Sequence, residues 1–552
     1  MSKSTLRARG LAAVLFSLAA AAFVTAAFAH ETLSDLIRAG NREAVFAAIT
    51  SPDIDVNAAD PDGSTALLWA THNVDHELVR ALLKAGAKAN VTNHFGASPI
   101  GEAAKLGDAE LARALLEAGA DPNSPNQDGQ TVLMLASSVG APKVAELLIN
   151  KGAQVNALET FRGQTALMWA AAGNHPEVVD VLVAHHADVK VRAKYDDWPR
   201  QMTSEPRAQF RQTGGLTALL YAARSGCTRC AVAIVKAGAD VNQPSPDGIT
   251  PLINAINNRS YDIAMFLLDR GANPGAWDMT GRTPIYVAVD MNSFKGGGGP
   301  NFGGPAEPNP PSKATAMDVV NRLLAMGVDP NHELTRMRPN GSGRGRFSDY
   351  MLRGGTAPLM AATLGYDPEA IKALLAHGAE VDLPNVFRIT PLMAAAGMTG
   401  SFRSAIDPVG GTTPPPGDVQ LHAIEVIDLL LDGGANINAR VTDNHNRTAR
   451  LTAYVYNREN EGKSALFASA EFGWDKVVRH LLDRGADPSL RDATGKTALD
   501  YARAPAPISA GGTIADDTNG GRFATANRAA TVAILEAVTP RTVGAKNTTS
   551  VE

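Results

Sequence analysis

The chain has 552 residues, which exceeds a typical single-core domain, so it must contain several domains or a repeat array. Hydrophobic residues make up 45% and aromatic residues only 5%, a balance that favours small-residue helix packing over β-sandwiches. The formal net charge of −5 lacks the strongly basic character of proteins that bind nucleic acid or anionic membranes.

The first 29 residues have the composition of a secretory signal peptide. Three cations precede an unbroken apolar or small run over 11–26, and Ala27-Phe28-Ala29 supplies small residues for a cleavage site. We therefore expect a mature chain that begins at His30 and is periplasmic or secreted, with no stable membrane insertion after cleavage. The alternative is an uncleaved anchor, because the run is near the minimum length for a span.

A short pattern recurs along the rest of the chain: Thr or Ser (once Ala), then Pro, Ala or Val, then an apolar residue. It starts at Thr65, Ser98, Thr131, Thr165, Thr217, Thr250, Thr283, Ala357, Thr390, Ser464 and Thr497, most often at intervals of 33 residues. A Gly-Ala marker follows at a fixed offset, as at Gly119-Ala120 and Gly485-Ala486. A fixed period of this length indicates a repeat architecture.

This pattern resembles the ankyrin repeat over nearly all of the predicted mature chain. The sequence TPLINA at 250–255, with GADVN at 238–242 closing the preceding repeat, carries the resemblance most clearly. The resemblance implies an all-α solenoid of about 12 helix-turn-helix repeats with β-turn fingers, and a groove that binds protein partners.

The chemistry of the pattern agrees with this fold. A Thr at the motif start can cap the first helix of a repeat, and Pro at the next position suits the first helical residue. Paired Ala residues let two helices pack closely, and Gly after the second helix accepts the left-handed conformation. Each repeat therefore buries its apolar surface by stacking on the next.

The spacing predicts the following organisation of the chain. We divide it into a signal peptide (1–29), a degenerate N-terminal capping repeat (30–60), repeats (61–189), a finger insertion (190–213), repeats (214–290), repeats with helix-loop and finger insertions in a long-plus-short period (291–496), a C-terminal capping repeat with an insertion (497–540) and a disordered tail (541–552).

Two classes of insertion interrupt the period. Insertions between the two helices of a repeat are expected at about 291–314, 398–420 and 503–527, and they are rich in Gly and Pro. Insertions in the β-turn fingers are expected at about 190–213, 333–353 and 441–461. The finger insertions combine Arg with aromatic residues, which are the residue types that most often anchor protein interfaces.

The finger insertions predict a binding rim beside the groove, open to a partner with an acidic or mixed surface. The candidate partner-binding residues there are Trp198, Arg200, Arg336, Arg338, Arg344, Arg346, Phe347, Tyr350, Tyr454 and Tyr456. Two alternatives stay open: the loops fold back onto the repeats, or 338–347 binds nucleic acid as an Arg-Gly-rich segment. The export signal argues against nucleic acid.

Positions just after the paired Ala residues are predicted to face the groove, and Arg224, Asn257 and Asn258 occupy three of them. Trp69, Trp169 and Tyr221 share another register, four residues after the motif start. Their side chains either pack between helices or form an aromatic stripe on the groove.

Cys227 and Cys230 are the only cysteines, and they form a Cys-x-x-Cys motif at the start of a second helix. A structural disulfide, two packed free thiols and a redox-active pair all fit this motif. The surrounding sequence lacks the βαβ pattern of a thioredoxin, and position 231 is not the His of a c-type haem motif.

No sequence motif for a zinc protease, a serine hydrolase or a phosphate loop occurs in the chain. We therefore expect a monomeric, non-enzymatic binding scaffold for protein partners, with no cofactor and no metal. The alternatives are a redox- or metal-linked accessory protein that uses Cys227 and Cys230, and an array that only tethers other envelope proteins. Fold alone does not separate them.

Overall fold

A computed structural model describes residues 32–196, 213–293, 311–335, 355–385, 387–398, 418–442, 460–504 and 526–538. The predicted signal peptide and the predicted tail at 541–552 lie outside these residues. The described residues are mainly helical. They also contain a two-stranded antiparallel sheet of β1 (Tyr195–Asp196) and β2 (Thr213–Gly214). This ladder forms the stem of the first predicted finger insertion.

The helices of the described residues form twelve helix-turn-helix pairs. The first helices are α2 (Leu33–Arg38), α4 (Ala66–His72), α6 (Pro99–Leu106), α8 (Val132–Ser138), α10 (Ala166–Ala172), α12 (Ala218–Ser225), α14 (Pro251–Asn257), α16 (Pro284–Ser293), α18 (Pro358–Leu364), α20 (Pro391–Ala395), α23 (Ala465–Phe472) and α25 (Ala498–Arg503). The second helices are α3 (Arg42–Ile49), α5 (His76–Lys84), α7 (Ala109–Glu117), α9 (Pro142–Asn150), α11 (Pro176–Ala184), α13 (Thr228–Lys236), α15 (Tyr261–Asp269), α17 (Ala316–Ala325), α19 (Pro368–Ala376), α21 (Val419–Asp432), α24 (Asp475–Asp483) and α26 (Arg528–Val538).

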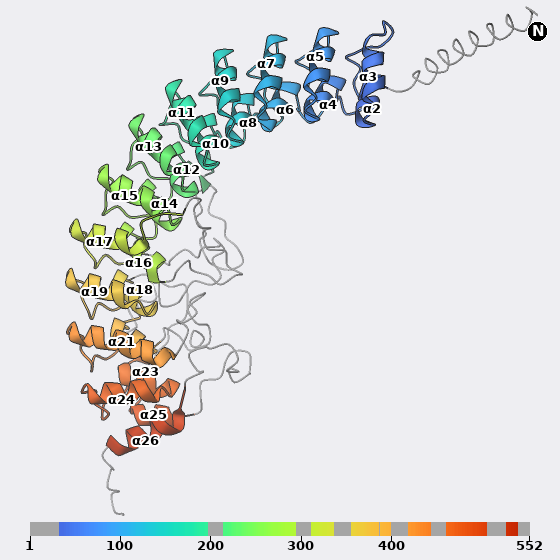
Figure 1. The fold of residues 1–552 in the computed structure, drawn as a ribbon. Helices are drawn as coiled ribbons and strands as arrows, with labels where there is room; N and C mark the ends of the chain where they lie inside the picture. Colours follow the sequence, from blue (N-terminus) through green and yellow to red (C-terminus); the bar gives the residue numbers. More distant parts are fainter. Residues whose placement is uncertain are drawn as a thin grey trace, which may run out of the picture. The chain divides into compact units, whose positions relative to one another are not determined.

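The chain divides into two compact units. The first extends to Lys194 and includes Gly215–Ala222 and Arg229–Ala239; the second contains Tyr195–Gly214, Ala223–Thr228 and all residues from Asp240 onward. In each unit, helix pairs stack in chain order (Figure 1), with first helices against first helices and second helices against second helices. The prediction of an all-α array of helix-turn-helix repeats is therefore confirmed.

The first helices begin as the motif predicts. At Thr65, the side-chain oxygen accepts from the backbone N–H of Leu68, while the residue itself is extended. Equivalent caps occur at Ser98, Thr131, Thr165, Thr217, Thr250, Thr283, Thr390 and Thr497. The prediction is wrong at Ser464, whose side chain makes no cap bond, and Ala357 has no side-chain oxygen to make one.

A ladder of asparagine side chains connects successive repeats on the side of the Gly-Ala markers. The Asn123 amide donates to the carbonyl of Gly152 (3.0 Å) and accepts from the N–H of Gln154 (2.8 Å). The same pair of hydrogen bonds, one donated and one accepted by the Asn side chain, recurs at Asn57, Asn90, Asn156, Asn242, Asn331 and Asn438. Asn331 and Asn438 keep it although insertions interrupt the 33-residue period around them.

We expect Asn123→Ala to lower the free energy of unfolding by about 1–3 kcal/mol, because the carbonyl of Gly152 and the N–H of Gln154 both lose their partner. Urea denaturation followed by circular dichroism measures this loss. Asn150→Ala is the control, because Asn150 ends α9 and no hydrogen bond of its side chain joins described residues of two repeats. An equal loss in both variants would contradict a stabilising role for the ladder.

Each insertion predicted between two helices falls between the described helices of one pair. At the first two insertions, however, a neighbouring helix extends further than predicted. α16 continues to Ser293 because Asn292 and Ser293 donate to the Asp367 carboxylate of the next pair, at 2.7 and 2.8 Å. α21 already begins at Val419, where the Gln420 side chain accepts from the N–H of Lys476 at 2.9 Å.

The last helix begins where the predicted insertion at about 503–527 ends. α26 starts at Arg528, whose guanidinium donates to the carbonyls of Glu471 (2.7 Å) and Ala502 (3.1 Å) in the two preceding first helices. These bonds secure the capping repeat at the end of the stack. The sequence motif gave no indication of them, because they join residues that are far apart along the chain.

Candidate binding surface

The fingers and the first helices supply the side chains that remain available on one face of each unit. The first finger is a tight hairpin, in which the N–H of Asp60 donates to the Ser64 carbonyl at 2.8 Å and Gly63 takes a φ of +83°. Phe95 and Phe161 lie at the tips of two later fingers and are 69% and 76% exposed. Large exposed rings on rigid turns are suited to protein contact.

Neighbouring fingers are joined through their backbones. The N–H of His94 donates to the carbonyl of Asp62 at 2.8 Å, and the N–H of Lys194 donates to that of Arg162 at 2.7 Å. In the second unit, the N–H of Met279 donates to the Asp247 carbonyl at 3.0 Å. This coupling fixes the distance between successive finger tips within each unit.

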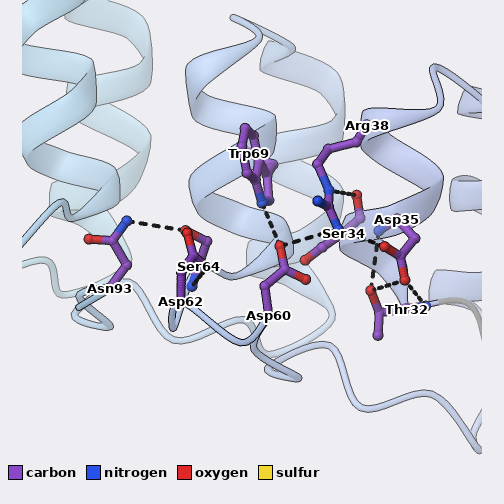
Figure 2. A network of polar contacts seen from close by, with 9 residues as sticks. All are labelled: Thr32, Ser34, Asp35, Arg38, Asp60, Asp62, Ser64, Trp69 and Asn93. Carbon is purple, nitrogen blue, oxygen red and sulfur yellow. Dashed lines mark hydrogen bonds and ion pairs between the residues drawn. The ribbon is translucent and has the colours of Figure 1, made fainter. Parts of the chain in front are cut away.

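A connected polar cluster occupies the N-terminal end of this face (Figure 2). The Arg38 guanidinium pairs with Asp35 at 2.6 Å and lies 5.6 Å from the centre of the Trp69 ring. The Trp69 indole donates to the Asp60 carboxylate at 2.9 Å, so a carboxylate, an indole and a guanidinium hold one another in place. The cluster thus joins the capping repeat to the next repeat.

Local hydrogen bonds favour the ionised form of two carboxylates in this network, Asp35 and Asp62. The N–H and hydroxyl of Thr32 lower the pKa of Asp35, with a smaller contribution from Arg38. The N–H and hydroxyl of Ser64 likewise lower the pKa of Asp62. Both carboxylates accept hydrogen bonds from residues of their own turns, and Asn93 extends the network by donating to the Ser64 hydroxyl at 3.1 Å.

The aromatic residues Trp69, Trp169 and Tyr221, which share one register, differ in their exposure to solvent. The Trp69 and Trp169 rings are partly exposed, whereas Tyr221 is buried and its hydroxyl contacts the Gln164 amide. Next to Trp69, the His72 ring lies edge-on to the indole and bonds to Glu102 at 2.8 Å. Tyr221 is therefore packed, whereas the two tryptophan rings keep some exposed surface, and an aromatic stripe on the groove stays a prediction.

In the second unit, a buried ion pair fixes the finger beside Asn257. Arg282 donates to the Asp278 carboxylate at 2.7 Å, and both side chains are buried. The same guanidinium reaches the Asn257 side-chain oxygen at 3.3 Å. Asn258 bonds back to the carbonyl of Asn254 at 2.8 Å. Both predicted groove asparagines therefore have structural partners. Arg224 is exposed and lies at the end of α12.

Sequence reasoning missed this ion pair, although a signal was available. The residue before the motif start is uncharged in most repeats, whereas Arg282 places a guanidinium there, four residues after an Asp. An Arg in a position that other repeats bury needs a partner, and Asp278 is the carboxylate within reach.

Cys227 and Cys230 are disulfide-bonded in the structure, at the start of α13. Both residues are buried. A buried disulfide offers little access to an exchanging thiolate, which fits a structural role better than a redox-active one.

The other predicted partner-binding residues lie outside the described residues. These are Trp198, Arg200, Arg336, Arg338, Arg344, Arg346, Phe347, Tyr350, Tyr454 and Tyr456. The stems on which they stand are described: besides the β1–β2 ladder, the N–H of Leu334 donates to Thr356 at 3.0 Å and that of Val441 to Lys463 at 2.9 Å.

Within the described ranges, no group of three or more His, Cys, Asp or Glu side chains could hold a metal ion. The helices of those ranges also include none with both the length and the apolar character that a membrane crossing requires.

Comparison with known families decides what the repeats are. A model of three consecutive ankyrin repeats matches residues 33–126, 100–193 and 219–296, and a single-repeat model matches 461–493. The chain is an ankyrin-repeat protein. These matched ranges do not include 297–460, where insertions interrupt the period, yet α17 to α21 continue the series of helix pairs there.

Several curated proteins share these ankyrin repeats. The RelA-associated inhibitor of Mus musculus is 37% identical over 93 residues, which is 17% of this chain and 11% of the relative. The B-cell lymphoma 3 protein homolog of Mus musculus is 33% identical over 81 residues, 14% of this chain and 18% of the relative. The putative palmitoyltransferase ZDHHC13 of Danio rerio is 30% identical over 265 residues, 45% of this chain and 34% of the relative.

The ankyrin chain therefore spans between about a tenth and a third of the length of these curated relatives. The family identifies the repeats as a scaffold of the kind that binds proteins. The relatives are similar in their repeats, and nothing else of theirs transfers with that similarity.

Proposed function

We propose that this protein is an exported, non-catalytic ankyrin scaffold that binds a protein partner through its fingers and first helices. The observation that supports this most strongly is the pair of exposed phenylalanines, Phe95 and Phe161, on fingers that are coupled to their neighbours. Rigid aromatic side chains bury large area at little entropic cost. One relative, the RelA-associated inhibitor, is by its name a protein that associates with another.

Export rests on the composition of residues 1–29 alone. The proposal places the mature protein in the periplasm or outside the cell, as a monomer that does not bind nucleic acid. Sequencing the N-terminus of the secreted product tests it: the proposal requires a start at His30. A product that begins at Met1 and sediments with membranes would instead make residues 1–29 an anchor.

The finger insertions are proposed to add anchoring residues to this surface. Removing 337–352, between the described stems Thr335 and Gly355, should weaken partner binding at least tenfold, about 1.4 kcal/mol. The deletion leaves Leu334 in place because this residue is buried and pairs with Thr356. Isothermal titration with a partner purified from envelope extract measures the change.

The matched control removes 296–309, between α16 and α17, where the insertion is rich in Gly and Pro. Its anchors are retained: the Ser312 hydroxyl donates to the carbonyl of Arg259 at 2.9 Å, and the N–H of Ala314 donates to Asp262 at 2.9 Å. The control should bind nearly as well as the intact protein. Loss of binding in the control alone would place the functional surface on the opposite edge.

The second candidate is a redox-linked accessory role for Cys227 and Cys230. The Cys-x-x-Cys motif favours a redox role, but the burial of the disulfide argues against one. Titration of the native, unreduced protein with a thiol reagent separates the two: the scaffold proposal expects no reactive thiol. Replacing both cysteines by serine should leave partner binding unchanged.

A further inference from the structure

Several cations of the described residues make ion pairs between repeats, whereas three cations on neighbouring fingers of the first unit do not. On the second helices, guanidinium groups pair with carboxylates of neighbouring repeats, as Arg42 does with Asp75 and Glu77 and as Arg229 does with Glu177. On the fingers of the fifth and sixth repeats, by contrast, Arg162, Arg192 and Lys194 make no ion pair within the described part of the chain.

These three finger cations lie on one continuous edge of the first unit. The N–H of Lys194 donates to the Arg162 carbonyl at 2.7 Å, which aligns the two fingers. Arg192 and Lys194 are two residues apart in an extended segment, with the buried Ala193 between them, so their side chains share the exposed face. The Lys194 ammonium donates to the carbonyl of Thr160 at 2.6 Å and to no carboxylate.

Among the described residues, the neighbouring carboxylates of Glu159 and Asp188 make no ion pair with these cations. Glu159 is buried, and its oxygens accept the backbone N–H groups of Phe161, Arg162 and Gln164. The carboxylate of Asp188 accepts a backbone N–H from Lys190. Both carboxylates therefore accept backbone N–H groups of their own turns. Among the described residues, the guanidinium groups of Arg162 and Arg192 make no ion pair and can bind a carboxylate of a partner.

Behind this edge, two shielded polar atoms lack a partner. Within the part of the chain that the structure describes, the Trp169 indole N–H and the Gln164 side-chain oxygen make no hydrogen bond, and the Gln164 residue is only 6% exposed. The equivalent indole of the second repeat, that of Trp69, donates to a carboxylate, Asp60. In the fifth repeat the equivalent carboxylate is Glu159, which the finger backbone already occupies.

We propose that this edge binds an acidic peptide segment of the protein partner. A partner carboxylate accepts the Trp169 N–H, as Asp60 accepts that of Trp69, and a partner backbone N–H donates to Gln164. Further acidic side chains pair with Arg162 and Arg192, and the exposed Phe161 adds apolar contact. The phosphates of a nucleic acid carry no hydrogen-bond donor, so only its bases or a ribose hydroxyl could meet the Gln164 oxygen, whereas every peptide unit other than proline offers a backbone N–H. The inference rests on the proposed protein-binding function.

Fluorescence anisotropy with a defined probe tests the proposal. The probe is a labelled ten-residue peptide with four glutamates, and its matched control carries glutamine at those positions. Arg162→Glu with Arg192→Glu should weaken binding of the acidic peptide at least tenfold, and Trp169→Phe should weaken it about fivefold, the value of one hydrogen bond of about 1 kcal/mol. The glutamine peptide should bind at least tenfold more weakly than the acidic one.

The matched control is Lys84→Glu with Lys88→Glu, which changes the net charge equally at two exposed lysines elsewhere in the first unit. It should alter binding by less than twofold, and circular dichroism should show both double variants folded. Equal weakening by the control, or tighter binding of a single-stranded oligonucleotide than of the acidic peptide, overturns the proposal. If the acidic peptide does not bind while the envelope partner still does, this inference fails and the proposed scaffold function stands.

Discussion

Arg282→Ala is expected to lower the free energy of unfolding by about 3–5 kcal/mol, because the change leaves the Asp278 carboxylate buried without its cation. The guanidinium donates to Asp278 at 2.7 Å and to Asn257 at 3.3 Å, so two side chains lose a partner at once. Urea denaturation of the intact chain, followed by circular dichroism, measures the loss. Asp278→Asn in the same background should recover part of it by removing the uncompensated charge.

Arg322→Ala is the matched control for this prediction. Arg322 also pairs with an aspartate, Asp269, at 3.0 Å, but both side chains are exposed to water. Exposed ion pairs contribute about 0–1 kcal/mol, so the control should unfold nearly as the unmodified protein does. Similar losses in the two variants would show that burial of the Arg282 pair is not what makes it important.

Trp474→Ala should also cost about 3–5 kcal/mol, because it leaves a cavity between the last repeats. The Trp474 side chain is 0% exposed, and its ring lies 5.9 Å from that of Phe472. In a repeat array the damage spreads to neighbouring repeats through their shared interfaces. Hydrogen exchange should therefore show lost protection in α23 to α26, with the first unit unaffected.

Trp277→Ala provides the comparison at an exposed site. Trp277 is 61% exposed and stacks on the His332 ring with centroids 5.7 Å apart. Its removal should cost about 1 kcal/mol or less, because the stacking contact is lost but no cavity forms. A cost as large as that of Trp474→Ala would mean that the finger bearing Trp277 carries part of the core.

The regular part of the fold could be predicted from sequence because one physical requirement recurs in every repeat. A hydroxyl cap, small residues between helices and a left-handed Gly were each readable at fixed offsets, as Thr250, Ala255 and Gly271 illustrate. The interruptions were also placed between the correct helices, since the Gly-Ala markers counted the residues on each side.

Contacts between repeats could not be predicted in this way. The role of Asn123 depends on a carbonyl 29 residues later, and the extension of α16 depends on Asp367 in the next pair. The candidate surface shows the same limit: Asn257 was predicted from its register to face the groove, but the nearby Arg282 takes its side-chain oxygen. A single sequence gives the register of a side chain without giving its neighbour.

Site-specific photo-crosslinking tests the central claim most directly, which is that a protein partner contacts the finger face. The photoreactive residue benzoylphenylalanine replaces Phe95 or Phe161 at the finger tips, or, as the control, Met326 after the second helix α17, which is also exposed. The account predicts that the envelope partner crosslinks at Phe95 and Phe161 and not at Met326. Crosslinking confined to Met326 would contradict it, because the partner would then contact the second-helix side.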